Sequence, residues 1–238
     1  MRLFKKVLAV SVASMCALSL AACGGSKSAE TTAAASSESK EETKAGESVS
    51  EAVAATGKDA KDIKVGISIY KFDDNFMTLY RNELVRYLTE DCGIPKDNIV
   101  VQDGKNDQAE QTNQINNFIA TKVDVMILNL VQSSSAPTVT DLAKEAGIPV
   151  VYINREPDET EESRWASDGI KATYVGADAR QSGTFQGEEI AELDNKGDIN
   201  GDGTVKYIMI QGDPENIDAQ YRTEYSVKAL TEKSEIGR

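Results

Sequence analysis

The sequence predicts an α/β protein built on a doubly wound parallel sheet, arranged in two lobes of which the second is incomplete. Short apolar runs alternate with segments whose apolar residues recur at helical spacing. The apolar runs are nearly continuous, as in parallel strands that are covered on both faces. Only two strand-like runs fall in the second lobe, and two strands do not form a stable layer by themselves.

The first lobe accounts for most of this alternation. Its expected strands are residues 63–69, 99–102, 123–128 and 149–153, and its expected helices are residues 75–90, 107–121 and 135–146. In the second helix Ile115, Phe118 and Ile119 stand at i, i+3 and i+4. The third ends at Gly147, just before Pro149, a helix-ending arrangement.

The second lobe begins after a polar stretch. Residues 158–171 are mostly polar and include Trp165, the one tryptophan of the chain. The elements expected beyond it are a strand at 173–175, a helix at 179–193, a strand at 205–211 and a helix at 218–232. Because the sequence stops at Arg238 after two strands of this lobe, we expect a truncated product; a compact single domain is the alternative.

The amino-terminal part has the form of an export signal. Residues 1–6 are basic and residues 7–22 are apolar but too short for a good membrane span, so 1–22 is expected to be a signal peptide. Its Leu-Ala-Ala-Cys ending resembles the lipobox of bacterial lipoproteins, which implies lipidation of Cys23; an ordinary signal peptide is the alternative. Residues 23–60, rich in Ser, Ala, Thr and Glu, are expected to form a disordered tether. We assign residues 61–153 to the first lobe and 154–238 to the second, at the outer face of the cytoplasmic membrane or in the periplasm.

Composition excludes several classes of function. The formal net charge is −13, which argues against binding nucleic acid through its phosphates. The chain has no histidine, so it lacks the commonest general base and transition-metal ligand. Beyond the signal and the lipid site only Cys92 remains, and one thiol makes no intrachain disulfide.

The turn between the first expected strand and helix carries acids beside aromatic residues. Asp73, Asp74 and Phe76 lie there, at the carboxyl end of a strand, where open α/β sheets bind ligands. An aromatic ring suits the apolar C–H face of a sugar, and a carboxylate accepts charge-assisted hydrogen bonds from its hydroxyls. The alternative is that one of the acids or Asn75 caps the helix and that Phe76 packs in the core.

Five separate stretches extend this hypothesis to a family. They are residues 65–77, 106–108, 128–131, 149–157 and 174–178. Together they resemble the galactose/glucose-binding proteins of bacterial sugar importers, and the likeness spans about residues 64–230. The resemblance implies a two-lobed periplasmic-binding-protein-like fold, a crossover near 153–157, a first strand of the second lobe at 174–178, and no catalysis.

The resemblance also implies roles for residues of the first lobe. Tyr70 would line the mouth of the site, Asp74 would accept sugar hydroxyls, and Phe76 would stack on one face of the sugar ring. Asn129 would bond another hydroxyl, whereas a turn residue at a strand end is the alternative.

In the second lobe the resemblance implies polar contacts from Asn216, Asp218 and Arg222. The family usually has a histidine where this chain has Asn216, and an amide still donates and accepts. The choice between glucose and galactose therefore stays open. The alternative is that Asp218 is a helix N-cap and that Arg222, four residues later, is its surface partner.

Residues 198–205 have the form of the first half of an EF-hand-like calcium loop. The expected calcium ligands are Asp198, Asn200, Asp202 and the backbone carbonyl of Thr204. Lys206 and Met209 stand where the late ligands of such a loop belong, so we expect a weakened or incomplete structural site. A plain polar turn and a dockerin module are the alternatives, although a dockerin carries two copies of the loop.

These observations lead to a functional expectation. The protein is expected to be a non-catalytic, lipid-anchored receptor that binds galactose- or glucose-type monosaccharides and passes them to ABC permease subunits. Presentation of the sugar to a chemoreceptor or sensor kinase is an additional possible role. The rivals are an exported sugar-active enzyme, which needs two carboxylates across a scissile bond, and a sugar-sensing regulator of the lactose-repressor type.

Overall fold

The structure is a computed structural model that describes residues 57–234. The predicted signal peptide, Cys23 and most of the predicted tether fall in residues 1–56 and lie outside the described residues. Among the helices of 57–234, none combines the length and the hydrophobicity that crossing a bilayer requires.

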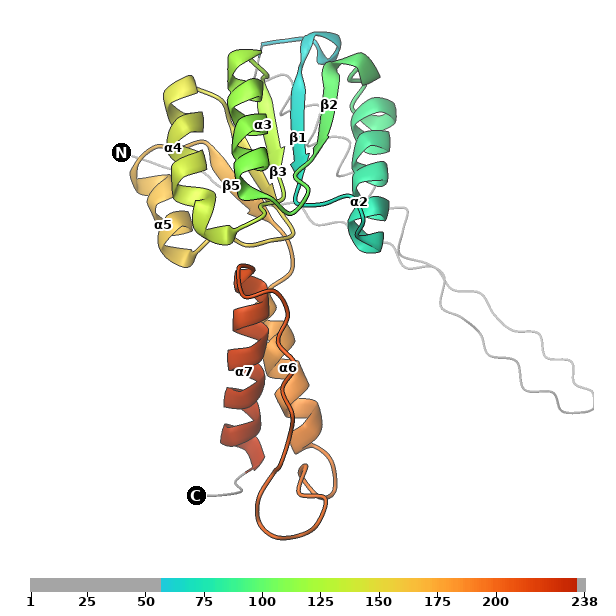
Figure 1. The fold of residues 1–238 in the computed structure, drawn as a ribbon, viewed down its shortest axis with the longest axis vertical. Helices are drawn as coiled ribbons and strands as arrows, with labels where there is room; N and C mark the ends of the chain where they lie inside the picture. The colour runs from blue at the N-terminus through green and yellow to red at the C-terminus, as the bar shows by residue number, and fades with distance from the viewer. Residues whose placement is uncertain (1–56, 235–238) are drawn as a thin grey trace, which may run out of the picture. The chain divides into compact units, whose positions relative to one another are not determined.

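The described chain contains a five-stranded parallel sheet in the order β2-β1-β3-β4-β5 (Figure 1). Its strands are β1 (Val65–Ile69), β2 (Ile99–Asp103), β3 (Val125–Leu128), β4 (Val150–Ile153) and β5 (Ala172–Val175). The α-helices are α2 (Asn75–Arg86), α3 (Gln108–Ala120), α4 (Ala136–Ala146), α5 (Glu159–Ser167), α6 (Ala179–Ala191) and α7 (Ile217–Ser234). A π-helical turn, Tyr87–Asp91, extends α2, and short 3₁₀ turns lie at Ala60–Asp62, Lys96–Asn98 and Ser133–Ser135.

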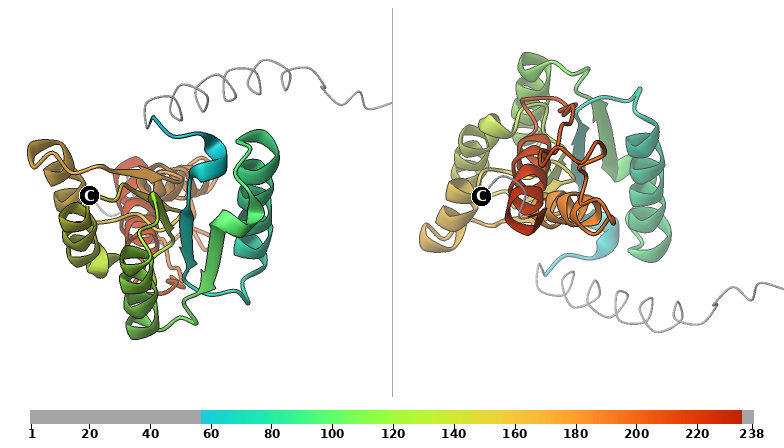
Figure 2. Two further views of the ribbon diagram at one scale, coloured as in Figure 1. Left: turned by 90° about the horizontal axis from the view of Figure 1, so that it is seen from above. Right: turned by 90° about the horizontal axis from the view of Figure 1, so that it is seen from below.

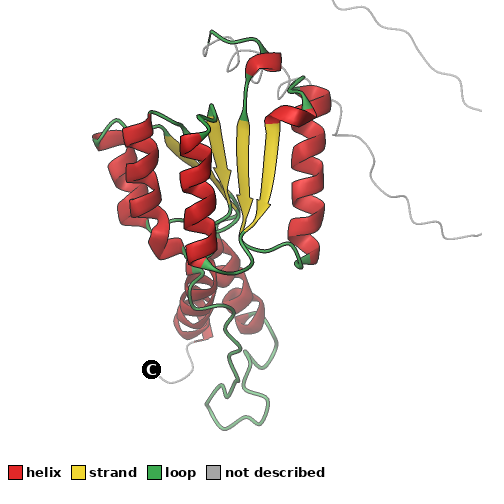
Figure 3. Cartoon of the chain, turned by 45° about the horizontal axis from the view of Figure 1, so that its top comes forward, coloured by secondary structure: helices red, strands yellow, loops and turns green. Residues whose placement is uncertain are grey.

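The core has two apolar clusters, one on each face of the sheet. Met126 and Leu128 of β3 pack in the cluster that also holds residues of α3, α4 and α5. Ile127, between them in sequence, packs in the other cluster with Met77 of α2. Successive residues of a strand point to opposite faces, so this split shows helices covering both faces of the sheet (Figures 2 and 3). The predicted doubly wound parallel fold is confirmed.

The elements of the first lobe follow the predicted ranges to within a few residues. Asp74 and Asp107 have extended backbones and accept hydrogen bonds from the first turns of α2 and α3, so each helix begins directly after a capping carboxylate. At its other end α4 stops where Gly147 adopts a left-handed φ of 72°. The predicted helix stop is therefore confirmed.

The strand expected to open the second lobe belongs to the first sheet instead. β5 pairs in parallel with β4, with Tyr152 opposite Tyr174 and Ile153 opposite Val175. The prediction placed the crossover one strand too early. Which strand pairs in parallel with β4 depends on how the segment between the strands crosses the sheet. The sequence did not predict a helix in that segment.

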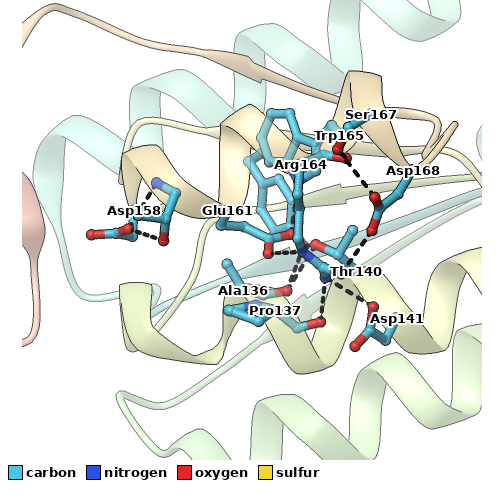
Figure 4. Close-up of polar contacts among 12 residues, drawn as sticks. Ala136, Pro137, Thr140, Asp141, Asp158, Glu161, Arg164, Trp165, Ser167 and Asp168 are labelled. Carbon is cyan, nitrogen blue, oxygen red and sulfur yellow. Dashed lines mark hydrogen bonds and ion pairs between the residues drawn. The ribbon is translucent and has the colours of Figure 1, made fainter.

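The segment in question is α5, which lies in the stretch expected to be merely polar. Asp158 caps it by accepting from the Thr160 amide, and Trp165 is buried on it, stacked on Tyr152 with ring centroids 5.6 Å apart. The Trp165 indole donates to Glu161 at 2.7 Å, and Arg164 pairs with both Glu161 and Asp141 of α4 (Figure 4). The Trp165 ring thus holds a polar helix against the sheet, and the Arg164–Asp141 ion pair ties it to α4.

Helices α6 and α7 pack closely on each other through glycine. A methyl group added at Gly183 would lie 2.7 Å from the Arg222 carbonyl oxygen, and one at Gly187 would lie 2.3 Å from that of Ser226. Only glycine permits this approach, because any Cβ atom would overlap the backbone of α7.

The predicted strand at residues 205–211 is wrong, since this stretch has no regular structure. Its side chains include Ile208 and Ile210, which are 92% and 89% exposed. A strand needs a hydrogen-bonded neighbour, and within residues 57–234 no strand pairs with this stretch; the other strand predicted for the second lobe, β5, lies at the edge of the first sheet beside β4.

Candidate functional site

The candidate site begins at the carboxyl end of β1, where Asp74 is held from two sides. Its Oδ1 accepts from the Met77 amide at 2.8 Å, and its Oδ2 accepts from the Tyr70 hydroxyl at 2.8 Å. The Met77 amide first, and the Tyr70 hydroxyl second, lower the pKa of this carboxyl. Asp74 therefore does cap the helix, and as an ionised carboxylate it keeps free lone pairs on both oxygens.

Phe76 presents its ring to solvent. The side chain is 59% exposed, and its ring centroid lies 6.0 Å from that of Tyr80 one turn later. The alternative that Phe76 packs in the core is wrong. An exposed ring two residues from a fixed carboxylate can stack on an apolar ligand face while the carboxylate takes its donors.

Asn129 is fully buried at the end of β3. Its Oδ1 accepts from the Tyr70 amide at 3.3 Å, and its Nδ2 donates to the Ile153 carbonyl at 3.0 Å and to Asn154 Oδ1 at 3.2 Å. The side chain thus joins the ends of β1, β3 and β4. Its predicted bond to a sugar hydroxyl stays a prediction, because here the amide is used within the protein.

The residues predicted from the second lobe lie at the start of α7. The helix begins at Ile217, and Asn216 accepts from the Asp218 amide at 3.1 Å, so Asn216 rather than Asp218 takes the capping role. Asp218 is 5% exposed and its Oδ1 has no partner among the described residues. Burial, as the largest cause, raises the pKa of this carboxyl to about 6, while a hydrogen bond with the Glu156 backbone opposes the rise; the charge of Glu156 adds to it and that of Arg222 opposes it.

Two charged residues just after β4 lie between the Tyr70–Asp74 pair and the start of α7. They were not among the predicted site residues. Arg155 is buried, with its guanidinium 4.0 Å from the centroid of the Tyr70 ring and Nη2 3.1 Å from Asp213 Oδ2. The next residue, Glu156, is also buried and accepts from Arg180 Nη1 at 2.9 Å. The sequence feature that could have indicated them is a pair of charged residues directly between a buried strand and Pro157, since buried charges need partners.

The hollows of the described surface fall in different places. One of about 300 Å³ is lined by residues around the start of α7, including Asp213, Asn216 and Arg222. A larger one of about 790 Å³ lies beside α2 and β2 and includes none of the predicted site residues. We place the candidate site by its polar groups, because the larger hollow lacks a carboxylate that is held as Asp74 is.

The predicted calcium loop is closed on itself. Asp198 accepts from the amides of Gly201, Asp202 and Gly203 at 2.8 to 3.2 Å. Asp202 accepts from Asn200 Nδ2 at 2.9 Å and from the Thr204 amide at 3.0 Å, and it pairs with Lys206. Within residues 57–234 no group of three or more Asp, Glu, Cys or His side chains could hold a metal ion. The predicted set also counts Asn200 and the Thr204 carbonyl, so the calcium site stays a prediction.

The parallel sheet, with polar residues gathered at the carboxyl ends of its strands, defines a ligand-binding lobe of the α/β class. A family model described as a periplasmic binding protein domain matches residues 65–237. The chain therefore belongs to the periplasmic binding protein family.

Individual relatives agree with this assignment. The chain is 34% identical over 177 residues to the D-galactose/methyl-galactoside binding periplasmic protein MglB of Haemophilus influenzae, covering 73% of this chain and 51% of the relative. It is 37% identical over 159 residues to a putative rhizopine-binding protein of Rhizobium meliloti, covering 67% of this chain and 47% of the relative. Among solved structures, an ABC transporter solute binding protein from Bacillus halodurans with bound myo-inositol is 26% identical, with a TM-score of 0.58, over 74% of this chain and 54% of that one.

The chain thus spans about half the length of the curated relatives it matches. The predicted resemblance to sugar-binding receptors is confirmed at the level of the family.

Proposed function

We propose that the complete protein is an exported receptor that binds a neutral monosaccharide or cyclic polyol and delivers it to an ABC importer without catalysing a reaction. The observation that carries the proposal is the β1–α2 turn, where ionised Asp74 lies two residues from the exposed ring of Phe76. The relatives support it, because the names they carry are those of binding proteins for galactose and rhizopine.

The chemistry of the carboxylates selects the ligand class. Each oxygen of Asp74 accepts one hydrogen bond from the protein and keeps a lone pair, so a ligand there must donate. Within residues 57–234 one oxygen of Asp218 has no partner, which also calls for a donor. Two carboxylates repel an anionic ligand, whereas hydroxyl groups donate to both. A polyhydroxylated ring with an apolar face satisfies the acids and Phe76 together.

Delivery would follow from closure of the two lobes over the ligand. Exclusion of water strengthens the hydroxyl–carboxylate bonds, and the permease distinguishes the closed receptor from the open one. We also propose that Cys23 carries a lipid that holds the receptor at the membrane, with a chemoreceptor or sensor kinase as a further partner of the same closed form. Loss of lipid labelling and release of the receptor to the medium on Cys23→Ser test the anchor.

The direct test is calorimetric titration of the complete protein with D-galactose, D-glucose, D-ribose and myo-inositol, followed by chromatography of the recovered ligand. We expect saturable binding of at least one of them with one site per chain, and unchanged ligand afterwards. Absence of binding to all four would overturn the proposal, and a converted product would favour the exported enzyme.

A further inference from the structure

Arg155 is a buried cation at the carboxyl end of β4 whose function the predicted site does not include. Its side chain is 6% exposed. It follows Asn154, whose left-handed φ of 64° turns the chain as it leaves the strand. A charged side chain is buried only where partners replace its water, so its contacts indicate its role.

The first contact of Arg155 is with the Tyr70–Asp74 pair. The guanidinium lies on the Tyr70 ring, 4.0 Å from its centroid, and Nη1 donates to the Val131 carbonyl at 2.5 Å. Tyr70 in turn donates its hydroxyl to Asp74, and its backbone amide bonds Asn129. The planar cation therefore supports the ring that fixes one oxygen of Asp74.

The second contact of Arg155 is with the segment that precedes α7. Nη2 donates to Asp213 Oδ2 at 3.1 Å, while the other oxygen of Asp213 accepts from the Glu215 amide. The Glu215 carbonyl accepts from the Ser133 amide at 3.1 Å, close along the chain to Val131. One guanidinium thus reaches both Tyr70 and the segment that carries Asn216 and Asp218.

We propose that Arg155 is a positioning residue of the ligand site, which acts through Tyr70 on the orientation of Asp74 and through Asp213 on the segment before α7. This inference rests on the proposed function, since it needs a ligand at Asp74. Lysine cannot reproduce the role, because an ammonium group lacks the plane that lies on the ring and the fork that reaches two acceptors.

A double-mutant cycle on the complete protein tests the route through Tyr70. We expect Arg155→Lys to weaken binding of the best of the four ligands about tenfold, and Tyr70→Phe, which removes the hydroxyl and keeps the ring, to do about the same. Because both variants disturb one bond to Asp74, the double variant should also lose about tenfold rather than about a hundredfold. Losses that multiply to about a hundredfold would show that the two residues act independently, and would overturn the inference.

Arg164 provides the matched control. It is likewise an arginine with several carboxylate partners, Glu161 and Asp141 among them, and it lies on α5 (Figure 4). Arg164→Lys should lower the melting temperature and leave ligand affinity unchanged. If it weakens binding as much as Arg155→Lys does, the effect is general destabilisation and the inference fails. Wild-type binding with unchanged affinity in Arg155→Lys would overturn the inference alone, whereas a wild type that binds none of the ligands would overturn the proposed function with it.

Discussion

Two carboxylates of the candidate site, Asp74 and Asp218, are held in opposite ways. Asp74 lies at a helix N-terminus, and both of its oxygens already accept hydrogen bonds, which lower its pKa. Asp218 lies buried in the first turn of α7; one of its oxygens has no partner in the described part of the chain, and its pKa is raised to about 6. The protein already orients and ionises Asp74, whereas one oxygen of Asp218 lacks a hydrogen-bond donor, which a ligand can supply.

This difference separates two ways in which a carboxylate contributes to binding. A preorganised acceptor is ionised and aimed before the ligand arrives, so little reorganisation opposes binding. An unsatisfied buried acceptor destabilises the unliganded protein and gains a partner on binding. The proposed receptor therefore combines a rigid first half of the site with a second half that the ligand completes.

The largest effect is expected where the preorganised acid is neutralised. Asp74→Asn keeps a good helix cap and removes the charge, so folding should persist while affinity for the ligand falls about 100-fold. Asp73→Asn is the matched control, since the Asp73 side chain is 82% exposed and pairs only with Lys71 among the described residues. Calorimetry should show the loss in the first variant alone. Equal losses in both variants would erase the distinction between the two neighbouring acids.

The next effect concerns Asp218, for which stability and affinity should move in opposite directions. The folded pKa lies above the ordinary value of 3.8, so the folded state holds the proton more tightly and stability falls as pH rises from about 4 to about 6. Asp218→Asn should remove this fall, stabilise the protein at pH 7 by on the order of 2 kcal/mol, and weaken ligand binding about 30-fold. Urea unfolding at pH 4 and pH 7 measures the first effect. A variant less stable than the wild type at pH 7 would contradict the description of Asp218 as an unsatisfied acid.

A smaller effect is expected from Phe76, the aromatic residue of the β1–α2 turn. Phe76→Ala should weaken binding about tenfold through lost stacking and leave the melting temperature nearly unchanged, because the ring is 59% exposed. Leu79→Ala, on the same helix and 72% exposed, should change neither quantity. A tenfold loss of affinity in the Leu79 variant as well would point to α2 as a whole rather than to the ring.

The smallest effect is expected from calcium, which should stabilise the 198–205 loop and leave Asp74 and Asp218 unaffected. With Lys206 paired to Asp202, added calcium should raise the melting temperature by about 2 °C or less. Lys206→Gln frees that carboxylate and should enlarge the shift. Thermal melts of the wild type and of Lys206→Gln, each with calcium and with chelator, measure the shift. If calcium moves the curve of neither protein, the loop is better described as a plain polar turn.

The sequence predicted the first lobe well because its signals are local. Each strand is a short apolar run and each long helix has a capping residue or a stop signal beside it, as at Asp107 and Gly147. It missed α5 because that helix is polar on most of its surface and is held by Trp165 and by ion pairs to another element. It misplaced β5 and predicted a strand at 205–211 because pairing between strands is set by tertiary contacts.

The site residues likewise fall into those that local sequence signals predict and those that depend on tertiary contacts. The acid and ring of the β1–α2 turn follow from their position after a strand, and the structure keeps both at the surface of that turn. The buried state of Asn129, the unpartnered oxygen of Asp218 and the reach of Arg155 depend on residues distant in sequence. No periodic pattern marks a single charged side chain that becomes buried through such contacts.

The most direct test is a crystal structure of the complete protein with its tightest-binding monosaccharide or polyol. We predict ligand hydroxyl oxygens about 2.5–2.9 Å from the oxygens of Asp74, a ring face on Phe76, and a donor at the oxygen of Asp218 that lacks a partner here. A ligand bound elsewhere, with the Asp74 carboxylate still bonded to Tyr70 and Met77 and to no ligand atom, would contradict the account.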